Sequence, residues 1–184
     1  MVFMISEIIG VLVVTVYMAY IFTGFIRYPG LMSFKEQMKL SAIISAPAVI
    51  LHEMAHKFTA VALGYPAQFM AFYESSWTFI LAGISMFLRF IHAGFIFIVP
   101  GFVLIPSNTP VLDSGIIAFA GPLINLLIWV GIGIYLKYNH KMKEKTYFIL
   151  VVTRKINLFL FIFNMIPFGM FDGAKVLDAI LSLI

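Results

Sequence analysis

Long apolar stretches constrain this chain more than any other feature, because each is long enough to cross a lipid bilayer. Residues 5–26, 38–63 and 114–137 exceed the ~20 residues that a helix needs to span the hydrocarbon layer. Apolar residues make up 62% and charged residues 11% of the 184, against about 45–50% and about 25% in soluble domains. A soluble fold of this size cannot bury so much apolar surface, so lipid is expected around it.

The predicted fold is therefore an all-α polytopic membrane protein with about four transmembrane helices, in a single domain over residues 1–184. Residues 5–26 lack the basic start and the cleavage site of a secretory signal and contain Glu7, so we expect a retained span. A short polar connector follows, with charged or turn-forming residues at Arg27, Pro29, Gly30, Lys35, Glu36 and Lys39.

The region between the second and third spans, residues 64–113, is harder to interpret. It is too apolar for a solvated loop, yet glycine and proline interrupt it repeatedly. Residues 66–73 are consistent with a short strand. For residues 77–106, one further span, a re-entrant hairpin and membrane-embedded strands all remain open. We expect a short membrane-associated strand or re-entrant segment here, covered by protein or lining a water-filled cavity.

The last apolar stretch, residues 147–184, is interrupted by residues that break a helix. These are Asn164, Pro167, Gly169, Asp172 and Gly173. We therefore expect a broken helix. The span 114–137 precedes it, with Asp113 or Ser114 in position to cap its start, and a basic connector over 137–146 joins the two.

Charge and cysteine content exclude several classes of function. The formal net charge is +4, but no basic stripe alternates with exposed aromatic residues, so nucleic-acid binding has no support. The basic residues sit in short clusters between apolar runs, where they set orientation or meet lipid headgroups. The chain has no cysteine, which excludes disulfides, thiolate nucleophiles and cysteine zinc sites.

The second span contains the sequence His52-Glu53-Met54-Ala55-His56, which has the spacing H-E-x-x-H. Residues four apart lie on one helix face, so both imidazoles can point at one ion, and zinc accepts imidazole nitrogen at about 2.0–2.1 Å. Glu53 lies about 100° around the helix from His52, where a general base would stand beside the attacking water. Chance or a structural polar cluster is the alternative, but each ionisable group inside a span costs ~2.5–3.5 kcal/mol on insertion scales.

A catalytic zinc site has three protein ligands and one open position, so a third ligand is needed. The remaining histidines are His92 and His140. Among the three aspartates, Asp113 suits a helix cap, and Asp178 suits an ion pair with a lysine three residues earlier. Asp172 lies in the broken helix, where the turn can aim a carboxylate inward, so it is the best candidate. A buried polar kink is the alternative.

Two further motifs accompany H-E-x-x-H. The chain reads N-x-x-P-x-x-x-x-D-G from Asn164 to Gly173, and Gly121, Pro122 and Asn125 form G-P-x-x-N on the intervening span. These three motifs, in this order, resemble those of the site-2 proteases, which are intramembrane zinc metalloproteases. The resemblance covers roughly residues 38–184. It departs from the family at residues 168 and 169, where phenylalanine and glycine replace the usual prolines.

The resemblance implies a three-helix catalytic core, within about residues 38–184, that hydrolyses peptide bonds of membrane-spanning proteins in regulated intramembrane proteolysis. It implies that His52, His56 and Asp172 hold one zinc ion per chain and that Glu53 is the general base. The implied partners are a transmembrane protein substrate and the lipid bilayer, for a multi-pass protein of the cell membrane.

The resemblance also implies roles for two asparagines. Asn125 and Asn164 would bind the substrate backbone or polarise its carbonyl group. From the residues alone, each asparagine is equally consistent with a hydrogen bond between helices. A substrate helix must unwind locally to expose its scissile carbonyl, so we expect the region 64–113 to offer an edge strand that holds the extended substrate.

A competing hypothesis is a metal-binding membrane protein without hydrolase activity, such as a small transporter or an inactive relative. Transporters usually have paired repeats with broken helices in both halves, whereas only one helix is clearly broken here. A glutamate beside the first histidine is required for hydrolysis and not for transport. The sequence therefore favours a protease.

The orientation in the membrane follows from two considerations that disagree. The positive-inside rule puts the connectors 27–39 and 137–145 in the cytoplasm, and His52 to His56 would then lie towards the exterior. The resemblance implies a zinc site nearer the cytosolic face, with both connectors outside. Glu36 and Glu144 weaken the charge bias. Because the direction of the catalytic helix is tied to the architecture of the active site, we expect the orientation of the family.

Overall fold

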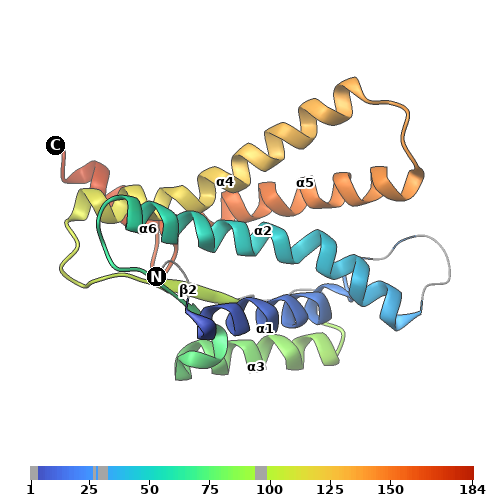
Figure 1. Ribbon diagram of the computed structural model, residues 1–184, viewed down its shortest axis with the longest axis horizontal. Helices are drawn as coiled ribbons and strands as arrows, with labels where there is room; N and C mark the ends of the chain where they lie inside the picture. The colour runs from blue at the N-terminus through green and yellow to red at the C-terminus, as the bar shows by residue number, and fades with distance from the viewer. Residues whose placement is uncertain (1–3, 27, 29–32, 94–98) are drawn as a thin grey trace. The chain divides into compact units, whose positions relative to one another are not determined.

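The computed structural model describes residues 4–26, 28, 33–93 and 99–184. Within these residues the chain is mostly helical, with six α-helices, one short 3-10 helix and two short strands (Figure 1). In chain order the elements are α1 (Ile5–Phe22), α2 (Phe34–Ala62), β1 (Gln68–Ala71), η1 (Phe72–Glu74), α3 (Ser76–Phe90), β2 (Gly101–Leu104), α4 (Val111–Tyr138), α5 (Glu144–Asn164) and α6 (Asp172–Leu181). Four of these helices, α1, α2, α4 and α5, are long and apolar enough to cross a bilayer. The predicted fold class is confirmed.

α2 begins four residues before the expected span. The backbone N–H of Glu36 donates to Ser33 Oγ at 3.3 Å, and the N–H of Ser33 donates to the Glu36 carboxylate at 2.8 Å. This reciprocal pair is a capping box, which starts a helix at the residue after the serine. The helix includes Lys35, Glu36 and Lys39, which were expected in the connector. Three other connector residues lie outside the described ranges: Arg27, Pro29 and Gly30.

The start of α4 also differs from the prediction. The helix follows Pro110, so neither Asp113 nor Ser114 caps it, and both lie inside its first turns. Asp113 instead accepts a hydrogen bond from the phenol of Tyr65, and this bond raises the pKa of Tyr65 above its ordinary value. A negative charge in the first turn still stabilises the helix, because it faces the positive end of the helix dipole.

The region between α2 and α4 contains the predicted strand, because β1 lies within residues 66–73. Residues 77–106 contain most of the helix α3 and then the strand β2. This combination differs from each of the three alternatives taken alone, namely a span, a re-entrant hairpin and membrane-embedded strands. α3 has 15 residues and is therefore about 22 Å long, too short to cross a hydrocarbon layer of about 30 Å. β2 then pairs with β1 in a two-stranded sheet.

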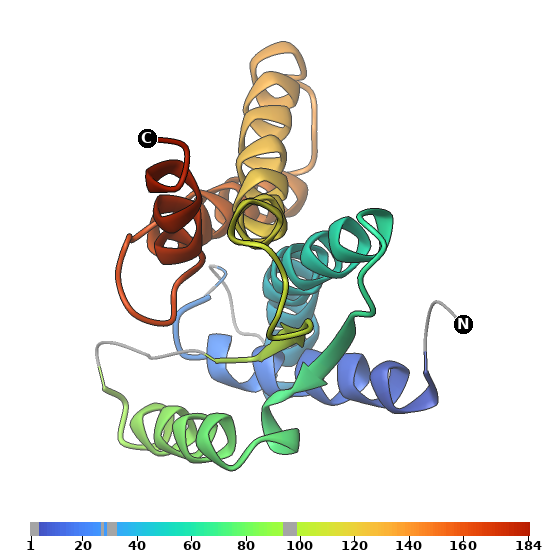
Figure 2. The same ribbon diagram turned by 90° about the vertical axis from the view of Figure 1, so that its left-hand side faces the viewer.

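Two compact units make up the chain, namely Met1–Val49 with Phe69–Phe102, and Ile50–Gln68 with Val103–Ile184. That all 184 residues act as one domain stays a prediction. In the first unit, α1 packs beside α3 (Figure 2). The carboxylate of Glu7, in the first turn of α1 and only 1% exposed, accepts the backbone N–H of Phe69 at 2.7 Å. The N–H of Ala71 donates to the Glu74 carboxylate at 2.6 Å. Two alternate donors of β1 are thus bound by carboxylates.

The second unit contains the remainder of α2 together with α4, α5 and α6. α4 runs beside both α5 and α6 (Figure 1). A methyl group on Gly115 of α4 would lie 2.2 Å from Cβ of Ala179 on α6, so these two helices approach closely through small residues, as membrane helices often do. On the other side, the Arg154 guanidinium of α5 fits against Gly133 and stacks over the ring of Trp129.

Candidate metal centre

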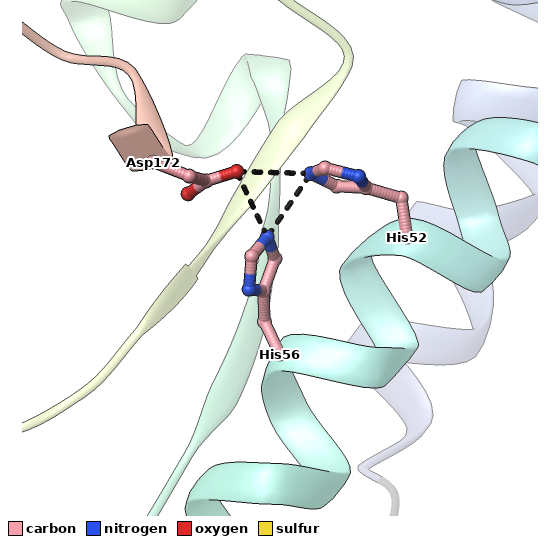
Figure 3. A group of neighbouring side chains, drawn as sticks. All are labelled: His52, His56 and Asp172. Atoms are coloured by element: carbon pink, nitrogen blue, oxygen red, sulfur yellow. Dashed lines mark hydrogen bonds and ion pairs between the residues drawn. The ribbon is translucent and has the colours of Figure 1, made fainter. Parts of the chain in front are cut away.

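His52 and His56 lie one helical turn apart on α2, in the second unit. The i, i+4 spacing puts both rings on one face, and their Nε2 atoms are 3.0 Å apart (Figure 3). Both side chains are buried, with relative exposures of 5% and 7%. The structure therefore brings the two predicted imidazoles together, with the same nitrogen of each ring directed at one point.

Asp172, the first residue of α6, is directed at the same point. Its Oδ2 atom lies 3.2 Å from Nε2 of His52 and 3.3 Å from Nε2 of His56 (Figure 3). The broken helix makes this possible, because α5 ends at Asn164 and the chain turns before α6 begins. Among the described residues, His52, His56 and Asp172 form the group of side chains whose ligand atoms, all within 4.8 Å of one another, could hold a metal ion.

Two glycines shape the turn between α5 and α6. Gly169 has a φ of +63°, a left-handed conformation that is open to glycine and closed to proline. At Gly173, a Cβ atom would lie 2.4 Å from the carbonyl carbon and oxygen of Met165. The turn is therefore tightened, and α6 starts directly against the backbone at the end of α5. This contact sets the position of Asp172, which immediately precedes Gly173.

The spacing of the three ligand atoms fits zinc. A tetrahedral zinc ion with bonds of about 2.0–2.1 Å has neighbouring ligand atoms about 3.3 Å apart, and the three separations here are 3.0, 3.2 and 3.3 Å. Two imidazoles and one carboxylate are also a ligand set typical of catalytic zinc, which leaves a fourth position for water or substrate.

Gly121 of α4 forms part of the wall at this group. A Cβ atom on Gly121 would lie 2.3 Å from Nε2 of His56 and 2.7 Å from Nε2 of His52, closer than any real side-chain contact allows. The helix backbone therefore passes directly over the two ligand atoms, and only glycine leaves that space open. The next residue, Pro122, has no N–H and cannot form the helical bond to the carbonyl of Ala118, which favours a bend here.

The second nitrogen of each imidazole has its own acceptor on α4. Nδ1 of His52 lies 2.6 Å from Oδ1 of Asn125, and Nδ1 of His56 lies 2.7 Å from the carbonyl oxygen of Ile117. An acceptor at Nδ1 keeps the proton on that nitrogen and leaves the lone pair on Nε2. In both rings the free lone pair thus lies on the atom that faces the group.

Glu53 follows His52 on α2 and is 8% exposed. It is not one of the three grouped ligands, and its role as general base stays a prediction.

The remaining candidates from the sequence are not part of the group. His92 and His140 are both exposed. Asp113 pairs with a tyrosine, as described above. The predicted ion pair of Asp178 with Lys175 is absent from the salt bridges of the described residues, and both side chains are exposed.

The two predicted asparagines differ in their surroundings. Asn125 is fully buried, and besides accepting from His52 it donates through Nδ2 to Oδ1 of Asn157 at 2.9 Å. Asn164, the last residue of α5, donates to the carbonyl oxygen of Leu160 at 2.9 Å. The sequence analysis did not single out Asn157. Its signal was an amide in the middle of an apolar span, where a polar side chain needs a partner.

Comparison with known proteins gives one relative. The chain is 36% identical over 140 residues to a protein of Methanocaldococcus jannaschii named "Putative zinc metalloprotease". The alignment covers 75% of this chain and 69% of that protein. No protein-family profile matches the chain, and no solved structure matches it.

Proposed function

Because this chain belongs to the zinc metalloprotease family of its Methanocaldococcus jannaschii relative, we propose that it is an intramembrane protease of the site-2 type. Its substrates are membrane-spanning proteins, which it cleaves in regulated intramembrane proteolysis at the cell membrane. The observation that carries the proposal is the location of His52 and His56 on α2, a helix long and apolar enough to span a bilayer. A metal centre on such a helix is suited to peptide bonds at membrane depth.

The residues proposed to hold zinc are His52 and His56, each through Nε2, and Asp172 through Oδ2, with one ion per chain. Their separations support this assignment, as does the open space at Gly121. When bound, zinc supplies Lewis acidity that brings the pKa of a water molecule towards ~7.

In the proposed reaction, Glu53 is the general base. It takes a proton from the attacking water while the water oxygen bonds to the scissile carbonyl carbon. Glu53 then passes the proton to the leaving amine as the C–N bond breaks. Its burial and its place next to His52 support this role, because a carboxylate shielded from bulk water exchanges protons with the reacting groups alone.

The two asparagines take different roles in this proposal. Asn164 stays the candidate that contacts the substrate backbone or polarises its carbonyl. The amide of Asn125 is engaged by His52 on one side and by Asn157 on the other, so we assign it to support of the ligand and not to substrate contact.

The proposal is tested with a panel of single-span peptides, mixed with the purified protein in mild detergent and examined by gel and mass spectrometry. We expect cleavage within a span, loss of cleavage with a zinc chelator and recovery on addition of zinc. Glu53→Gln should abolish hydrolysis, a loss of at least ~10² in rate for a general base, and should keep about one zinc per chain. Glu144→Gln, the same change at an exposed site on α5, should cleave as the wild type does.

Each component can fail separately. A wild-type protein without bound zinc contradicts the metal assignment. Full hydrolysis by Glu53→Gln removes Glu53 as the base. Stoichiometric zinc without cleavage of any peptide in the panel favours a metal-binding membrane protein without hydrolase activity.

A further inference from the structure

A row of hydrogen bonds runs from α5 through α4 to His52. Nδ2 of Asn157 donates to the carbonyl oxygen of Thr153 at 2.8 Å. Nδ2 of Asn125 donates to Oδ1 of Asn157 at 2.9 Å, and Oδ1 of Asn125 lies 2.6 Å from Nδ1 of His52. We infer that Asn157 is a positioning residue for His52, which acts by fixing the orientation of the Asn125 amide. The inference rests on the proposed role of His52 as a zinc ligand.

The direction of this row is fixed at its far end. The Thr153 carbonyl can only accept, so the NH2 group of Asn157 must face it and the amide oxygen must face Asn125. Asn125 must then turn its own NH2 group to Asn157 and its oxygen to His52. Nδ1 of His52 consequently carries the proton.

Loss of Asn157 removes the acceptor that holds the NH2 group of Asn125 in this orientation. An amide side chain has nearly the same shape after a 180° flip, which exchanges its oxygen and nitrogen. A flipped Asn125 would present N–H groups to His52. The imidazole would then change tautomer, so that Nδ1 accepts a hydrogen bond and Nε2 carries the proton. A protonated Nε2 cannot bind zinc. Asn157 thus selects the histidine tautomer that can bind the metal.

Burial makes the selection strict, because both Asn125 and Asn157 are 0% exposed and bulk water cannot reach them to compensate. His56 needs no such support. Its Nδ1 is held by the carbonyl of Ile117, a backbone acceptor that cannot turn into a donor. Of the two imidazoles, only His52 relies on a side chain that can flip.

The alternative to the positioning role is that the Asn125–Asn157 hydrogen bond only holds α4 against α5. Measurements of zinc affinity distinguish the two roles. We expect Asn157→Leu to weaken zinc binding about 10–100-fold, as loss of support around a ligand does. The measurement is the dissociation constant of the purified protein against a competing chelator. The visible spectrum of the cobalt-loaded protein should change with it. Asn139→Leu, the same change at an exposed asparagine after α4 that donates to the carbonyl oxygen of Tyr135, should leave zinc affinity within about threefold of wild type.

Asn125→Asp supplies the sharper test, because a carboxylate presents only acceptors to His52 and has no wrong orientation. Alone, it also leaves a carboxylate oxygen facing Oδ1 of Asn157, which can only accept, so it is used together with Asn157→Leu, which removes that oxygen. Combined with Asn157→Leu, it should restore most of the affinity that Asn157→Leu loses, although the Asn125–Asn157 bond is absent from the double variant as well. A hydrogen bond that only holds α4 against α5 predicts no such rescue.

The outcomes that overturn the inference are distinct from failure of the proposed function. Zinc affinity within about twofold of wild type in Asn157→Leu overturns it, and so does a double variant that binds no better than Asn157→Leu. If Asn157→Leu does not fold, Asn157→Ala takes its place in both comparisons, alone and with Asn125→Asp, and the same outcomes overturn the inference. A wild-type protein that holds no zinc overturns the metal assignment itself, and this inference with it.

Discussion

A methyl group at position 121 would lie 2.3 Å from Nε2 of His56 and 2.7 Å from Nε2 of His52. Gly121→Ala should therefore push both imidazoles away from the point they share, and we expect zinc affinity to fall at least ~10-fold. The change also overpacks the contact between α2 and α4, at a cost of about 1–3 kcal/mol. Zinc content after dialysis and the apparent melting temperature in detergent measure the two effects.

The matched control is Gly131→Ala, on the same helix. A Cβ atom there meets nothing within 4 Å, and alanine is the better helix former by about 0.5–1 kcal/mol. This variant should keep zinc and be at least as stable as wild type. Equal zinc retention in both variants would contradict the close approach of α4 to the histidines.

The residues that the sequence could predict are those whose geometry is local. His52 and His56 are set by the period of one helix, and Asp172 was left as the best carboxylate once the other aspartates had alternative roles. The role of Asn157 was not predicted, because its partner depends on the register of α4 against α5. No local sequence pattern encodes that register. The role of Gly121 was not predicted for the same reason, although the motif G-P-x-x-N was recognised.

At the scale of elements, the turn between α5 and α6 decides where the third ligand lies. A Cβ atom on Gly173 would lie 2.4 Å from backbone atoms of Met165, and backbone cannot rotate out of the way. We expect Gly173→Ala to displace the start of α6 together with Asp172, to lower the stability by at least about 1–3 kcal/mol, and to reduce zinc content. Thermal unfolding and metal analysis of the purified variant measure both.

Gly83→Ala is the control for this change, because a Cβ atom on Gly83 of α3 also meets open space. It should lower neither the melting temperature nor the zinc content. A Gly173→Ala protein that matches this control in both measurements would show that α6 does not depend on the contact with Met165.

The sequence predicted which elements exist better than where they begin. Four spans were expected and four helices of sufficient length are described, because apolar length is visible in composition alone. The start of α2 was misplaced because charged residues suggested a connector, whereas Ser33 and Glu36 form a capping box. Residues 77–106 stayed ambiguous because short apolar runs have no period long enough to separate a helix from a strand.

On the scale of the whole molecule, a topology in which α1, α2, α4 and α5 each cross the membrane would place the two basic connectors on one side of it. Because α3 is too short to cross, α2 would lead away from the side of Lys35 and α4 would return to the side of Lys141. The proposed site-2 architecture requires that side to be the exterior, with the zinc nearer the cytosol. The positive-inside rule requires the opposite.

Cysteine labelling decides between these orientations, because the chain contains no cysteine of its own. We expect Lys35→Cys and Lys141→Cys to react with a membrane-impermeant thiol reagent in intact cells. Ser107→Cys, an exposed position before α4, should react only after the cells are opened. The reverse pattern would establish the orientation given by the charge rule, and different labelling at positions 35 and 141 would contradict the four-span topology.

The carboxylates of Glu7 and Glu74 occupy the N–H groups of Phe69 and Ala71 in β1. Unpaired donors along a strand are a template on which other copies of a protein can aggregate. Here the template is blocked by hydrogen bonds to charged groups within the same chain. Copies crowded together in a membrane therefore cannot use these two donors to join through β1.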